Sequence, residues 1–228
     1  MSQARLRDAI ASLSGTAARL SHLSQRSYQN PYAALAWPES VDPEADWFGS
    51  PELLSLYGTR LWDSLDERAR RRLAFFEAAN FYSLNIHGEK SLIQGLAGRL
   101  YRKDLVDVAD YLHHFLDEEN KHSIFFGGFC TRYAHIYRSR QFAVEDGQLP
   151  RDVGDFLFFA KTMIFEEIVD NYNWVQARDE RLHPVARTDP AAGGQLLQVY
   201  DVVGRDDVAD VGHRRAPDLA EVDPQQPA

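Results

Sequence analysis

Apolar positions recur every three to four residues over four long stretches of the chain, which is the spacing of amphipathic α-helices. Ser50 before Pro51 predicts a further helix start, because a capping residue precedes proline at the first helical position. Asp104 is expected to cap the third long helix. No stretch before residue 189 alternates with period two for long enough to predict a sheet. The expected fold class is therefore all-α, a bundle of long helices over residues 1–29, 66–101, 104–137 and 152–181.

The helical pattern stops at Asp189, where the composition of the chain also changes. Residues 189–228 contain Tyr200 as their one aromatic residue, four Gly, four Pro and eight acidic residues against three Arg. Such a segment buries too little apolar surface to offset an ordering cost of roughly 1–2 kcal/mol per residue. We therefore expect a helical domain over residues 1–188 and a disordered, aberrant tail over residues 189–228.

The charge and cysteine content exclude several classes of protein. The 228 residues carry 34 acidic and 25 basic side chains, a net charge of −9, which argues against nucleic acid as a partner. The apolar runs are far shorter than a membrane span of about 20 residues. A single cysteine, Cys130, excludes a disulfide framework and a cysteine-based metal site. No secretory apolar segment is visible, and the cytoplasm is the expected location. The Arg-rich start over residues 1–29 keeps a transit peptide open as an alternative.

Glu119 and His122 form a Glu-x-x-His pair on a stripe that is otherwise apolar. A carboxylate and an imidazole on a core face need a partner, because an unpaired buried charge costs several kcal/mol. A metal ion would satisfy both side chains, and so would a hydrogen-bonded pair without metal. The stripe consists of Leu112, Phe115, Leu116, Glu119, His122 and Phe126.

Two further acids on predicted helices have apolar neighbours. Glu89 follows a stripe that includes Ile86 and Leu92, but Glu77 on an adjacent face is a competitor, and periodicity alone does not choose between them. Glu166 shares a face with Met163 and Val169. Helical bundles that hold two iron or manganese ions use one Glu from each of two helices and a Glu-x-x-His from each of the other two. Glu89, Glu119 with His122, and Glu166 would supply three of these four contributions from three helices.

A second Glu-x-x-His, Glu180 with His183, would complete the set by spacing alone. It is not favoured, because its stripe contains Asn173, Gln176 and Ala177, which reads as a solvent face. His183 also precedes Pro184, where the helix is expected to end.

Several segments, in order, resemble the p-aminobenzoate N-oxygenase family. The resemblance covers roughly residues 20–188. It implies a ferritin-like diiron oxygenase, usually homodimeric, that uses dioxygen to convert an aryl amine to a nitro group. It also implies Glu89, Glu119, His122 and Glu166 as iron ligands, and so favours Glu89 over Glu77. The segments are SPELLSLYG at 50–58, NFYSLNIHGE at 80–89, FLDEENKH at 115–122, FEEI at 165–168 and HPVART at 183–188.

The chain departs from this family after Thr188. Members continue with a last helix that bears His-x-x-x-Glu-x-x-His, but the matching positions here fall near Gly193, Leu197 and Tyr200, which cannot replace those ligands. The departure coincides with the change in composition, which indicates an altered coding frame. We therefore expect a bundle that is incomplete at its C-terminus, weak iron binding, and an apolar face without its covering helix. A truncated, catalytically inactive interaction module and a ferritin-like metal carrier stay open as alternatives.

Overall fold

The computed structural model describes residues 3–26, 28–138 and 149–187, and within these ranges it contains only helices and loops. The long helices are α1 (Gln3–Arg26), α3 (Glu67–Ala97), α4 (Ala109–Tyr133) and α5 (Arg151–Arg178). A short α2 (Arg60–Ser64) and two 3-10 turns, η1 (Pro51–Leu53) and η2 (Val106–Val108), join them. The all-α prediction is confirmed. The segment predicted to be disordered, residues 189–228, lies outside the described residues.

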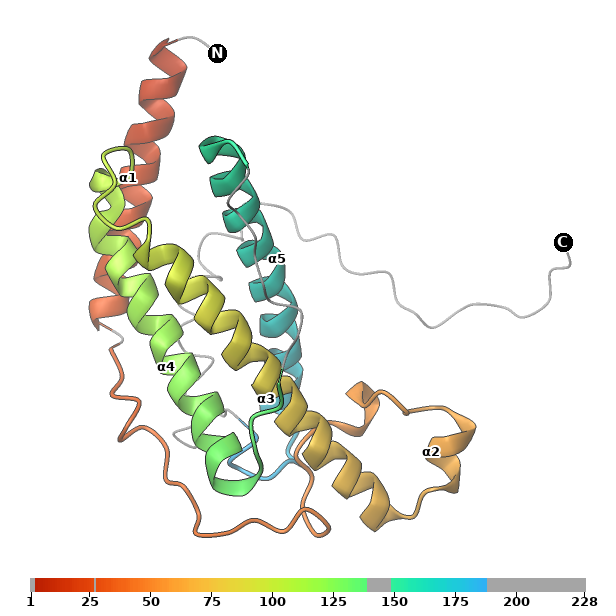
Figure 1. The fold of residues 1–228 in the computed structure, drawn as a ribbon. Coiled ribbons are helices and arrows are strands. Elements are labelled where there is room, and N and C mark those ends of the chain that lie inside the picture. The colour runs from red at the N-terminus through yellow and green to blue at the C-terminus, as the bar shows by residue number, and fades with distance from the viewer. Residues whose placement is uncertain (1–2, 27, 139–148, 188–228) are drawn as a thin grey trace, which may run out of the picture.

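The helices α3 and α4 form the centre of the bundle, with α1 alongside α4 and α5 along the other side of α3 (Figure 1). Helix α3 begins at Asp66, whose carboxylate accepts a hydrogen bond from the Ala69 backbone N–H at 2.7 Å. This is the usual way to satisfy a free N–H group in a first helical turn.

Local details differ from the sequence predictions near Ser50 and Asp104. The expected helix at Ser50 is only the 3-10 turn η1, and the Ser50 hydroxyl donates to Gln176 Oε1 instead of capping a helix. Asp104 does not cap α4, because its carboxylate pairs with Arg102 and Arg151. Side-chain contacts with Gln176, and with Arg102 and Arg151, therefore take the place of the two predicted caps.

Two separate apolar clusters lie between α3 and α4, at different levels along the bundle axis. The first, around Phe75, Ile86 and Phe129, also takes in Phe48 from the long loop before α2. The second lies further along α3 and α4 and consists of Leu92, Leu96 and Leu112 with partly buried neighbours. On α3, Glu89 lies between Ile86 of the first cluster and Leu92 of the second, and its side chain is buried.

The outer face of α5 is apolar and exposed. Its side chains are 39% to 71% accessible and share one side of the helix, opposite the side that faces α3. Met163, which the sequence pattern placed on the same face as Glu166, is 66% exposed and belongs to this outer face. The residues are Val153, Phe156, Met163, Ile164, Ile168, Trp174 and Val175.

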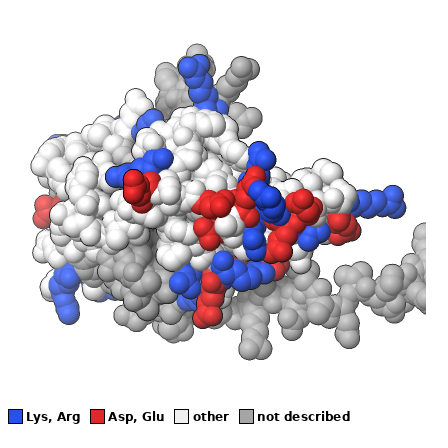
Figure 2. Space-filling view, turned by 90° about the horizontal axis from the view of Figure 1, so that it is seen from below, with Lys and Arg blue, Asp and Glu red and all other residues white. Residues whose placement is uncertain are grey.

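Charged side chains of both signs share the face of the molecule seen from below (Figure 2). Ion pairs between such side chains recur among the described residues, such as Arg71 with Glu67 and Arg68 with Glu44. This face therefore offers no broad basic surface of the kind that binds a phosphate backbone.

Candidate metal centre

Glu89 of α3 meets Glu119 and His122 of α4 in the interior of the bundle. Each residue offers one ligand atom, and these atoms all lie within 4.8 Å of one another. His122 Nδ1 is 2.9 Å from Glu119 Oε2 and 3.6 Å from Glu89 Oε1. We call these three residues the Glu–Glu–His cluster.

The helices bring the cluster together for simple geometric reasons. Glu119 and His122 are three residues apart, so they project from the same face of α4 on successive turns. Helix α3 packs along this face, and Glu89 occupies the gap between the two apolar clusters. The apolar residues on either side thus fix the level at which the polar groups meet.

The cluster is almost completely withdrawn from solvent. Glu89 and Glu119 are each 2% exposed and His122 is 5% exposed. Glu89 Oε2 is buried and has no hydrogen-bond partner among the described residues. A buried carboxylate oxygen in that position costs several kcal/mol unless a cation or a proton compensates it. Two carboxylates and an imidazole are donors that suit iron, so the residues present fit such an ion.

Burial and mutual contact shift the protonation of the cluster. Burial raises the pKa of Glu119 well above its ordinary value, although His122 opposes that shift. For His122, burial acts to lower the pKa, but the carboxylates of Glu119 and Glu89 outweigh it and the pKa rises well above the ordinary value. The metal-free cluster therefore retains a proton to higher pH than a free imidazole would, and an incoming cation must displace it.

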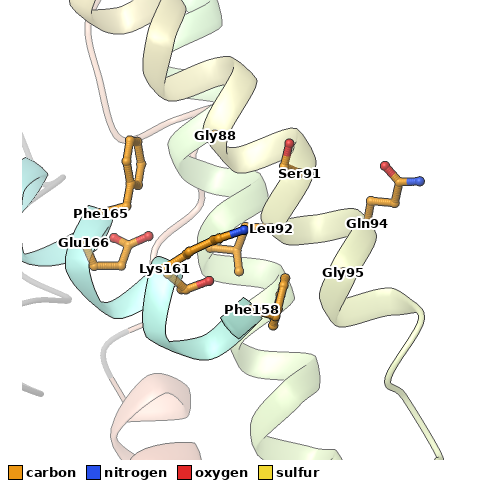
Figure 3. Close-up of a pocket in the computed structure, with 10 residues that line it drawn as sticks. Gly88, Ser91, Leu92, Gln94, Gly95, Phe158, Lys161, Phe165 and Glu166 are labelled. Carbon is orange, nitrogen blue, oxygen red and sulfur yellow. The ribbon is translucent and has the colours of Figure 1, made fainter. Parts of the chain in front are cut away.

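Glu166, the fourth predicted ligand, lies on α5 outside the Glu–Glu–His cluster. It lines a cavity between α3 and α5, together with Gly88 and Leu92 of α3 (Figure 3). Gly88 directly precedes Glu89, so the cavity lies at the same level of α3 as the cluster, although none of the three cluster residues lines it. The role of Glu166 as a ligand stays a prediction.

The competing acids have other partners or lie in solvent. Glu77 accepts hydrogen bonds from the Ser55 backbone N–H at 2.9 Å and from the Ser55 hydroxyl at 2.5 Å. Glu167 and Glu180 are exposed. Of the two acids on α3 between which the sequence pattern could not choose, Glu89 is the one that faces His122.

The second Glu-x-x-His belongs to a loop, because α5 ends at Arg178. His183 stacks on Phe48, with ring centroids 5.3 Å apart, and its backbone N–H donates to Trp47. The description of the preceding stripe as a solvent face is wrong. Asn173, Gln176 and Ala177 are buried, because the loop that contains Ser50 packs over them.

The cavity between α3 and α5 was not predicted from the sequence. It measures about 500 Å³, and Lys161 and Thr162 of α5 face Ser91 of α3 across it. The sequence feature that relates to this cavity is the pair Gly88 and Gly95, seven residues apart. From the sequence alone, both glycines indicate only weak points of a helix.

A family model described as P-aminobenzoate N-oxygenase AurF matches residues 11–188. No curated protein and no solved structure matches the chain. Across the described part of the chain, no helix combines the length and apolar character needed to cross a bilayer. The expected positions Gly193, Leu197 and Tyr200 lie outside the described residues.

Proposed function

The chain belongs to the p-aminobenzoate N-oxygenase family, and we propose that it is a non-haem diiron oxygenase scaffold for oxidation of an aryl amine towards a nitro group. Dioxygen is the proposed co-substrate and the cytoplasm the proposed location. The observation that carries the proposal is the buried Glu–Glu–His cluster with its unpartnered oxygen, Glu89 Oε2.

The cluster residues have separate roles in holding iron. Glu89 and Glu119 would supply anionic oxygen donors that offset the charge of the cations, and His122 would supply a neutral nitrogen once its proton has left. Glu166 is the proposed fourth ligand, from α5. When bound, a pair of iron ions would supply electrons and open coordination positions for dioxygen. The apolar clusters on either side would keep bulk water away from this chemistry.

We further propose that this chain holds iron weakly. Four ligands are proposed here, whereas the family resemblance implies seven, and the three positions near Gly193, Leu197 and Tyr200 offer no replacement. If a second reading frame of the gene after Thr188 encodes His-x-x-x-Glu-x-x-His, this would support the loss of these three ligands through an altered coding frame. Two tightly held irons per purified chain would contradict it.

A homodimer is the proposed assembly, and the apolar outer face of α5 is its proposed contact surface. The seven exposed apolar side chains share one side of α5, and large exposed apolar patches of soluble proteins commonly mark interaction sites. About 800 Å² per partner is usual in a stable interface. The same surface also favours the second candidate function, a helical interaction module without catalysis.

Metal analysis of the purified protein, together with ferrous titration under anaerobic conditions, tests the oxygenase proposal. Glu89→Ala should abolish saturable ferrous binding, and Glu180→Ala should leave it unchanged, because Glu180 is exposed on a loop. Wild-type protein loaded with iron should convert an aryl amine to hydroxylamino or nitro products in air, detected by mass spectrometry. Ferrous binding without any such product would favour the ferritin-like carrier, and absence of both would favour the interaction module.

A further inference from the structure

A second cavity, of about 510 Å³, lies between α1 and the start of α4. The described residues that line it are different from those that line the cavity between α3 and α5. Helix α1 runs alongside α4 (Figure 1) and contributes Ser14, Ala17 and Ser21, which share one face because they are three and four residues apart. The Gln25 side-chain amide donates to His114 Nε2 at 3.3 Å and so joins the two walls. Small side chains on α1 therefore leave space between two helices that are in contact.

Ser21 places a buried polar atom without a partner in this cavity. Its side chain lines the cavity, and the residue is only 8% exposed. The hydroxyl has no hydrogen-bond partner among the described residues, whereas the buried Ser83 hydroxyl donates to the Ala79 carbonyl at 2.7 Å. A buried hydroxyl is usually hydrogen-bonded, because burial without a partner is unfavourable. A ligand that offers a hydrogen bond in the cavity would satisfy Ser21.

Two carboxylates give the cavity a negative charge. Asp107 of η2 and Asp110 of α4 both line it, and they are three residues apart, so their side chains lie on neighbouring positions of one face. Neither forms an ion pair with another described residue, whereas Asp117, further along α4, pairs with Lys121 at 2.7 Å. No lysine or arginine is among the described residues that line the cavity. The cavity is therefore suited to a cationic ligand.

The size and the spacing of the polar groups favour an organic cation over a metal ion. His22, His113 and His114 also line the cavity, and imidazoles with carboxylates are possible metal ligands. Among the described residues, however, the Glu–Glu–His cluster is the only group of three such side chains close enough to hold one ion. Cavities of about 300–1,000 Å³ are typical of sites for small molecules.

We propose that this cavity binds a small linear polyamine, an organic cation with two ammonium groups joined by a short methylene chain. The ammonium groups contact the carboxylates of Asp107 and Asp110, and the Ser21 hydroxyl accepts a hydrogen bond from one of them. The methylene chain lies against Ala17 and Val108, which supply apolar surface to the lining. Because the ligand contacts both walls, it fastens α1 to α4. The site is separate from the Glu–Glu–His cluster and needs no iron.

Calorimetric titration of the full chain in chelator tests the proposal, with putrescine and its neutral analogue butane-1,4-diol as probes. Putrescine should bind about tenfold more tightly, the gain expected from two partly solvated ion pairs. Replacement of both acids, Asp107→Asn with Asp110→Asn, should bring the ratio of the two Kd values to about one. Asp63→Asn is the matched control, because Asp63 is also an exposed acid in the first turn of a helix but does not line the cavity.

Ser21→Ala separates a ligand-binding role of the hydroxyl from a structural one. This variant should have a higher Tm without ligand, because an unpartnered buried hydroxyl is removed, and it should bind putrescine about three- to tenfold more weakly. A serine with only a structural role would change the Tm and leave the affinity unchanged. Ferrous binding should be the same as in the wild type, so the outcome is independent of the oxygenase proposal.

Added salt provides a measurement that needs no variant. Raising the salt concentration should weaken binding of putrescine to the wild type and leave binding of the diol unchanged, because salt screens partly exposed charges. Circular dichroism would verify that the doubly substituted protein folds. Equal affinity of the wild type for the two probes, no binding of either, or an equal loss in Asp63→Asn would overturn the inference. Saturable zinc binding that depends on Asp110 and His114, without putrescine binding, would identify a metal site instead and would also overturn it.

Discussion

Glu118 and Glu119 are adjacent buried acids on α4 for which substitution by glutamine should have opposite consequences. Glu119 Oε2 lies 2.9 Å from His122 Nδ1 inside the Glu–Glu–His cluster. Glu118 Oε1 accepts a hydrogen bond from Lys121 Nζ at 2.9 Å, outside that cluster. Glutamine keeps the shape of the side chain but replaces an anionic donor by a neutral amide. Glu119→Gln therefore removes a proposed metal ligand, whereas Glu118→Gln removes only an ion pair.

The expected size of the effect follows from linkage between binding and folding. Ferrous iron at one hundred times its Kd would stabilise the wild-type protein by about 2.7 kcal/mol. For a domain of this length, each kcal/mol raises Tm by about 2–4 °C, so the wild-type Tm should rise by about 5–11 °C. A hundredfold loss of affinity in Glu119→Gln would leave about 0.4 kcal/mol at the same iron concentration, which is a rise of about 1 °C.

Thermal unfolding followed by circular dichroism, under anaerobic conditions with and without ferrous iron, measures these shifts. Glu118→Gln should lower Tm without metal, because Lys121 then keeps only Asp117, at 2.7 Å, as its acidic partner. It should still show the full rise with iron. An iron-dependent rise in Glu119→Gln as large as that of the wild type would refute the assignment, as would an equal loss in Glu118→Gln.

Three further predictions concern pH, packing and assembly. Because the pKa of His122 is raised and iron requires the neutral imidazole, ferrous affinity should fall by about tenfold per pH unit below that pKa, and ferrous titrations over a pH series should show this fall beginning at a higher pH than a free imidazole would give. Gly95→Ala should lower the free energy of unfolding by about 1–3 kcal/mol, because the new methyl group overlaps Phe158. Gly127→Ala should raise it by about 1 kcal/mol, because a new Cβ there meets nothing within 4 Å and alanine favours a helix more than glycine does. Urea titration measures both changes. Ile168→Glu should weaken self-association, since Ile168 is 63% exposed on the outer face of α5; an unchanged mass by light scattering would exclude this face as the contact.

The periodicity of the sequence predicted the long helices because their core faces are apolar over many turns. It failed where side-chain contacts with residues outside the helix decide the local structure. Asp104 reads as a helix cap, but nearby arginines engage its carboxylate. Gln176 reads as a solvent residue, yet the Ser50 backbone N–H donates to it at 2.9 Å and the surrounding loop buries it. A polar side chain with a buried partner cannot be distinguished from an exposed one by its type alone.

The candidate site was likewise predicted only in part from the sequence. Glu119 and His122 were predicted as members of one buried stripe, which the structure confirms. Periodicity could not choose between Glu77 and Glu89, because both have apolar neighbours. The family resemblance favoured Glu89, and the structure adds the reason, since Glu77 accepts hydrogen bonds from Ser55 instead. The cavity beside the cluster depends on the register between α3 and α5. A pattern within one helix carries no information on the register between two.

X-ray absorption fine structure of the ferrous-loaded protein tests most directly whether the cluster binds iron. The account predicts an iron centre with oxygen donors and one imidazole per chain, and loss of the imidazole scattering in His122→Ala. A spectrum of fully hydrated iron, or imidazole scattering that persists in His122→Ala, would contradict it.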